Sequence, residues 1–167
     1  MRKLILTLAI LIGFGAANVT VAQSVDQNVT IIVKQITEIT QTLDDVTIVI
    51  EAAEAGQDPD PVSQSGGNLA VTSNTTNVKK VTARLGGRYY NGDVTLGIKL
   101  NVPEEGGVNN KAADFTELPA QTEVELFRGR QMKASTIGID YQATATYQAD
   151  PKENGETKKV TFTITDS

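Results

Sequence analysis

Apolar and polar residues alternate along most of the chain beyond residue 22, and threonine fills many of the polar positions. Such alternation places apolar side chains on one face of a β-strand, and β-branched residues pack well on that pleated surface. The clearest case is residues 94–102, in which five apolar residues alternate with polar or small ones. The pattern predicts a half-buried strand there.

The same alternation predicts further strands along the chain. Their inward-facing residues are Val29, Ile31 and Val33; Val46, Ile48 and Ile50; Leu69 and Val71; Val81, Ala83 and Leu85; Thr122, Val124 and Leu126; Ile137, Ile139, Tyr141, Ala143, Ala145 and Tyr147; and Val160, Phe162 and Ile164. Between the first two groups, Ile36 and Ile39 lie in a polar stretch that is either a bent strand or a connection.

Proline and glycine divide these strands. Residues 56–67 contain Asp-Pro-Asp-Pro and a glycine pair, which predicts a loop, and residues 103–119 are predicted to be mostly loop. The pairs Asn91-Gly92 and Asn154-Gly155 accept the positive φ of tight hairpin turns. About eight short strands without a helical period indicate an all-β fold, an immunoglobulin-like antiparallel β-sandwich of about seven to nine strands. A β-barrel is the alternative.

The N-terminus resembles a secretory signal peptide. Arg2 and Lys3 precede an apolar run of about 11 residues, shorter than the roughly 20 that a membrane-spanning helix needs. Small residues before Ala22 predict cleavage between Ala22 and Gln23. We therefore expect residues 1–22 to be removed, a single domain over residues 23–167, no membrane insertion of the mature chain, and a secreted, periplasmic or cell-surface location.

Composition narrows the function. The predicted mature chain has 13 basic and 20 acidic side chains, a net charge of −7, and no extended basic patch, so nucleic acid is not an expected partner. It has no cysteine and no histidine, which removes imidazole and thiolate catalysis and most transition-metal sites. We expect a non-enzymatic protein without a cofactor. Two groups of acidic residues, near Asp58 and near Glu156, lack the spacing of a calcium loop and are interpreted as solvated.

One short segment is a candidate binding surface. Arg88, Tyr89 and Tyr90 precede a predicted turn, and exposed tyrosines beside polar groups commonly stack on sugar rings or contact proteins. In a strand, only one of two neighbouring residues faces the core. The alternative interpretation is therefore one core tyrosine and one ordinary surface tyrosine.

The short signal, a mature chain of about 145 residues, the Thr/Val-rich strands and a terminal strand at residues 159–165 resemble secreted bacterial β-sandwich proteins of the pilin and spore-coat-U-like kind. The resemblance implies a fibre or coat subunit that joins itself or other surface proteins by lending a strand to a neighbour's sandwich. Residues 28–33, with Val29, Ile31 and Val33 on one face, would be the donor strand. Alternatively, they form the first strand of a complete sandwich, and the protein is a binding module for carbohydrate or protein.

Overall fold

The computed structural model describes residues 27–43, 45–51, 53–103 and 107–167. The predicted signal peptide and its cleavage site lie outside these residues. The described part of the chain comprises a short N-terminal segment, residues 27–33, and a domain that begins at Lys34 and continues to Ser167.

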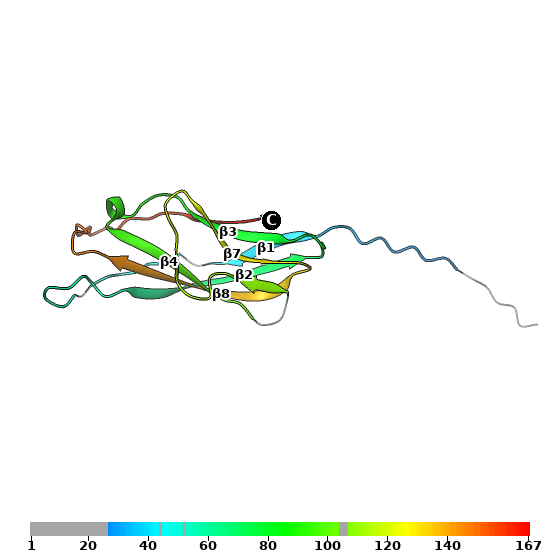
Figure 1. Cartoon of the computed structure of the whole chain (residues 1–167), viewed down its shortest axis with the longest axis horizontal. Coiled ribbons are helices and arrows are strands. Elements are labelled where there is room, and N and C mark those ends of the chain that lie inside the picture. Colours follow the sequence, from blue (N-terminus) through cyan, green and yellow to red (C-terminus); the bar gives the residue numbers. More distant parts are fainter. Residues whose placement is uncertain (1–26, 44, 52, 104–106) are drawn as a thin grey trace, which may run out of the picture. The chain divides into compact units, whose positions relative to one another are not determined.

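The domain contains two antiparallel sheets (Figure 1). The first has the strand order β1 (Thr37–Thr42), β2 (Val62–Ser73), β8 (Lys133–Ala145), β4 (Val94–Asn101) and β6 (Thr116–Glu117). The second has the order β5 (Val108–Asn110), β7 (Glu123–Gly129), β3 (Lys79–Leu85) and β9 (Val160–Asp166). The one helical element among the described residues is a single 3₁₀ turn, η1 (Tyr90–Gly92), at the predicted Asn-Gly turn.

The apolar faces of both sheets pack on each other and form one core. Ile98 of β4, Ile139 of β8 and Val81 of β3 are completely buried, as are the adjacent Leu126 and Phe127 of β7. Because two separate sheets enclose this core, the predicted antiparallel β-sandwich is confirmed and the barrel is not the fold. The predicted half-buried strand is confirmed over residues 94–101, with Leu96, Ile98 and Leu100 inside, and Val102 lies just beyond its end.

The predicted loop at residues 56–67 is partly wrong, because β2 already begins at Val62. The pair Gly66-Gly67 lies inside this strand, where the register against β8 shifts between Ser65 and Asn68. Gly66 lies against the ring of Tyr141, and Gly67 has a φ of +88° and lies against the carbonyl oxygen of Thr42. The glycines thus form a β-bulge inside a strand rather than ending a loop.

Three further strand predictions need correction. Residues 27–36, including Val29, Ile31 and Val33, belong to no strand, so they are not the first strand of the chain's own sandwich. Residues 45–50 alternate in burial as predicted but also belong to no strand. Strand β8 ends at Ala145, and Tyr147 is 78% exposed because its backbone amide turns away to Asp58 Oδ1, 2.8 Å distant.

Candidate functional site

The N-terminal segment carries an apolar stripe that no described residue covers. Val29, Ile31 and Val33 are 73%, 82% and 76% exposed, and as alternate residues they would share one face if the segment were in a strand. Isolated exposed apolar residues are ordinary, but a regular stripe of β-branched side chains is typical of a strand that gains a partner. The structure therefore leaves the predicted donor residues accessible.

Strand β9 is an edge of the second sheet, and it pairs with β3 only, as far as the described residues show. Gly86 N–H donates to the Lys159 carbonyl at 2.8 Å, and Ser167 N–H donates to the Val78 carbonyl at 3.0 Å. Backbone hydrogen bonding alternates along an antiparallel pair, so the odd-numbered residues of β9 bond to β3. The N–H and C=O groups of Val160, Phe162 and Ile164 consequently point away from the sheet.

The side chains of these three residues are also incompletely covered. They pack against the core but remain only partly buried, whereas Val81, Ala83 and Leu85 on the paired strand β3 are buried. Among the described residues, the outer edge of β9 thus combines backbone groups that have no strand partner with apolar side chains that still have area to bury. An edge of this kind is a template for the addition of another strand.

On the same side of the sandwich, β1 approaches β9. Leu43 follows β1 and packs against the core together with Val46 and Ile48. Among the described backbone hydrogen bonds, none ties residues 45–50 to any strand. Within the described part of the chain, the outer edge of β9 therefore has no partner strand that bonds to its backbone.

Asn74 holds the chain immediately before β1. Its side-chain Nδ2 donates to the Lys34 carbonyl at 2.8 Å, and its Oδ1 accepts from the Ile36 N–H at 2.8 Å. Its own backbone N–H donates to the Ile36 carbonyl at 3.2 Å. One residue beyond β2 thus makes three hydrogen bonds to residues 34–36 and continues the β1–β2 ladder with its side-chain amide. We call this arrangement the Asn74 clamp.

The structure places Arg88, Tyr89 and Tyr90 together at a turn, and the turn is tied to the connection between β8 and β9. Arg88 is exposed, and Tyr89 is partly buried against the core. Tyr90 N–H donates to Glu156 Oε2 at 3.1 Å, and the Lys152 ammonium lies 4.7 Å from the centre of the Tyr90 ring. Tyr89 is thus the tyrosine on the core, while Tyr90 is engaged by Glu156 and Lys152, which sequence reasoning did not connect to this turn.

Positive charge and hydrogen bonding set the ionisation of Glu156. Lys152 Nζ donates to Glu156 Oε1, and Lys158 Nζ lies 3.5 Å from Oε2. The hydrogen bond from Lys152 and then that from the Tyr90 amide lower the pKa of Glu156 to about 2. Burial raises the pKa of Tyr89, opposed by a backbone hydrogen bond to Lys158. Glu156 therefore stays a carboxylate under almost all conditions and serves as a fixed anchor for the turn.

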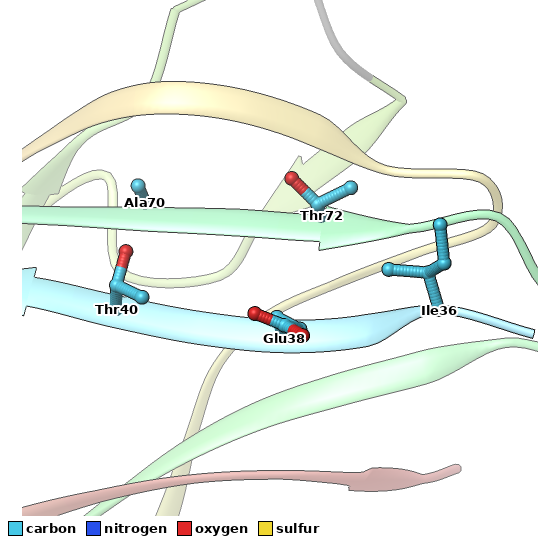
Figure 2. Close-up of a pocket in the computed structure, with 5 residues that line it drawn as sticks. All are labelled: Ile36, Glu38, Thr40, Ala70 and Thr72. Atoms are coloured by element: carbon cyan, nitrogen blue, oxygen red, sulfur yellow. The ribbon is translucent and has the colours of Figure 1, made fainter.

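A shallow groove lies on the outer face of the first sheet. Figure 2 shows Glu38 and Thr40 on β1, and Ile36 just before it, beside the small side chains of Ala70 and Thr72 on β2. The groove has a volume of about 350 Å³ and is open to solvent. It exists because alanine and threonine leave space beside the longer Ile36 and Glu38. It contains one carboxylate and no second charged group, which gives it no evident catalytic chemistry.

The acidic residues interpreted as solvated do not converge in the structure. Asp58 accepts a hydrogen bond from the Tyr147 amide and Glu156 accepts one from the Tyr90 amide, so each of these carboxylates holds a backbone group of a different segment. Within the described ranges, no three acidic side chains come together in a way that could hold a metal ion. The described residues also contain no helix that combines the length and apolarity needed to span a bilayer.

Comparison with models of known protein families finds no family that matches the chain, and comparison with curated proteins finds no match either.

Proposed function

We propose that this protein is a secreted, non-enzymatic structural protein of the cell surface, and that its copies assemble into a fibre or coat by β-strand addition. Residues 28–33 of one copy lie along the outer edge of β9 in the next copy. One observation supports the proposal above all: an uncovered apolar stripe and an uncovered, partly apolar sheet edge occur in the same chain.

The two surfaces complement each other physically. Addition of a strand would satisfy the outward N–H and C=O groups of Val160, Phe162 and Ile164. It would also bury Val29, Ile31 and Val33, and full burial of such a side chain is favourable by about 1.5–3 kcal/mol. Among the described residues, no strand pairs with this edge of β9, so the added segment would extend the second sheet by one strand.

A decisive experiment compares Ile31→Asp with Ile32→Asp in the mature chain. The two isoleucines are adjacent and almost equally exposed, at 82% and 80%, so neither substitution should affect the folded domain itself. Only Ile31 belongs to the stripe with Val29 and Val33. Size-exclusion chromatography and electron microscopy should show polymers of the unmodified chain and of I32D, and monomers of I31D. A wild-type chain that stays monomeric, or two variants that polymerise equally, would overturn the proposal.

Amide hydrogen exchange tests the acceptor strand separately. In the I31D monomer, the N–H groups of Val160, Phe162 and Ile164 should exchange quickly, and in the polymer they should become protected. The N–H groups of Thr161 and Thr163 bond to β3 and serve as the internal control, protected in both states. Polymers whose β9 outer edge stays unprotected would place the contact elsewhere.

The runner-up is an extracellular binding module for carbohydrate or protein at Arg88, Tyr89 and Tyr90. Exposure of Arg88 favours it, but Tyr89 packs on the core and the Lys152 ammonium lies over the Tyr90 ring. A sugar that stacks on that face of Tyr90 would have to displace Lys152. Binding to a glycan array that is lost in Tyr90→Ala would support this function, and no binding by the unmodified protein would exclude it for the glycans tested.

A further inference from the structure

We propose that Asn74 is a positioning residue that makes the joint between assembled copies stiff. The inference rests on the proposed function, because it concerns the three residues that separate a donated strand ending at Val33 from β1, which begins at Thr37. Without the Asn74 clamp, residues 34–36 would be a free linker. With it, the backbone of these residues is fixed to the domain.

The pattern of hydrogen bonds supports a mechanical role. The Asn74 side chain donates to the carbonyl of Lys34 and accepts from the N–H of Ile36, so its amide acts as a short piece of strand beside the chain. The backbone amide of Asn74 adds a third bond, to the Ile36 carbonyl. Three bonds on a three-residue stretch leave little backbone freedom there, although each is individually modest.

The Asn74 clamp holds the residues that directly follow the proposed donor segment. Donated residues would end at Val33, and the clamped stretch begins at Lys34, so no free residue separates the two. Loss of the two side-chain bonds, as in Asn74→Ala, would leave residues 34–36 held only by the backbone bond from Asn74 N–H to the Ile36 carbonyl. These three residues can span up to about 10 Å when extended. A free linker of this length allows neighbouring copies to change their mutual angle, and a clamped one does not.

Asn77 offers a matched control. It lies in the same turn after β2, is exposed, and donates no side-chain hydrogen bond in the described structure; its backbone N–H donates to Thr75 Oγ1 instead. Asn77→Ala therefore removes an asparagine side chain from the same turn without touching residues 34–36. Asn74→Asp provides a second variant, because it keeps an acceptor for the Ile36 N–H and loses the donor to the Lys34 carbonyl.

The test measures polymers of the mature chain by electron microscopy. We expect N74A to polymerise with a persistence length at least about twofold shorter than that of the unmodified chain, N74D to be intermediate, and N77A to be unchanged. In the I31D monomer, N74A should also raise the exchange rate of the Ile36 N–H by about 2- to 10-fold, as expected for loss of one hydrogen bond.

Failure of this inference differs from failure of the proposed function. Polymers of N74A and N74D as stiff as those of the unmodified chain would overturn the role of Asn74 and leave strand addition standing. A folded N74A that no longer polymerises would also contradict it, because the clamp is assigned stiffness and not acceptance of the strand. If the unmodified chain forms no polymer, the proposed function fails and the role of Asn74 fails with it.

Discussion

Glu156 and Tyr90 lie 66 positions apart in the sequence and are joined by a hydrogen bond of 3.1 Å from the Tyr90 amide to the Glu156 carboxylate. Tyr90 and Asn91 have positive φ values of 46° and 56°, which residues with a side chain adopt only at a cost. The carboxylate stabilises this strained turn from the connection between β8 and β9. The same hydrogen bond therefore lowers the pKa of Glu156 and holds a turn with positive φ values.

Substitution of Glu156 should therefore change the acid stability of the domain. The pKa of Glu156 is lowered from 4.5 to about 2, so the carboxylate stabilises the folded chain fully above pH 4.5. This contribution is lost as the pH falls from about 4.5 to about 2. Urea unfolding between pH 2 and 6 should show that, as the pH falls, the free energy of unfolding decreases less for E156Q than for the unmodified chain.

Glu153→Gln is the control for this experiment, because Glu153 lies on the same connection, is exposed and makes no ion pair within the described part of the chain. The free energy of unfolding of E153Q should fall with decreasing pH as steeply as that of the unmodified chain. An E156Q variant whose stability falls as steeply as that of the unmodified chain would show that the bond to Tyr90 does not carry the effect.

Tyr141 should determine how the free energy of unfolding falls at alkaline pH. Burial, and then the neighbouring Tyr89, raise the pKa of Tyr141 from 10 to about 12. The folded chain keeps this phenol neutral while the unfolded chain ionises, so stability is complete below pH 10 and falls between pH 10 and about 12. Tyr141→Phe should remove about 3 kcal/mol of this fall in the free energy of unfolding.

Tyr147→Phe is the matched comparison, since Tyr147 is 78% exposed and Tyr141 is 7% exposed. It should leave the alkaline unfolding curve, followed by circular dichroism, unchanged. If Tyr141→Phe also leaves the curve unchanged, other buried groups control the alkaline limit.

The strands that the sequence predicts correctly are those in which alternation coincides with backbone pairing. In β4 the buried Leu96, Ile98 and Leu100 alternate without interruption, so the pattern and the ladder agree. Residues 45–50 show the same alternation in burial but no ladder. Alternation reports which side chains reach the core, and it does not report whether another backbone lies alongside.

Contacts between distant residues could not be predicted from the sequence. Asn74 bonds to Ile36 and Lys34, which lie 38 and 40 positions before it in the sequence. A single asparagine after a strand looks like an ordinary turn residue. The sequence indicates only a solvated acidic group around Glu156, because its partner Tyr90 belongs to another turn. The sequence predicts a loop at the Gly66-Gly67 bulge, because glycine pairs mark both features and only the partner strand distinguishes them.

Gly66 provides the sharpest test of packing in the first sheet. Its φ is not in the left-handed region, so alanine is acceptable to the backbone there. The added methyl group would meet the Tyr141 ring, whose Cδ2 would be 2.7 Å away. Because Tyr141 is buried, its ring cannot swing into solvent without exposing apolar surface. Gly66→Ala should therefore lower the free energy of unfolding by about 1–3 kcal/mol, as overpacking does.

Gly97→Ala on β4 is the control, because its nearest neighbour, Phe115 Cβ, would be 3.5 Å away, an ordinary contact. A double-mutant cycle then identifies the cause. In a Tyr141→Ala background the ring is absent, so Gly66→Ala should cost much less than in the unmodified chain, and the two substitutions should be non-additive. Equal costs in both backgrounds would mean that the bulge needs glycine at position 66 for its backbone alone, and that the ring of Tyr141 does not select it.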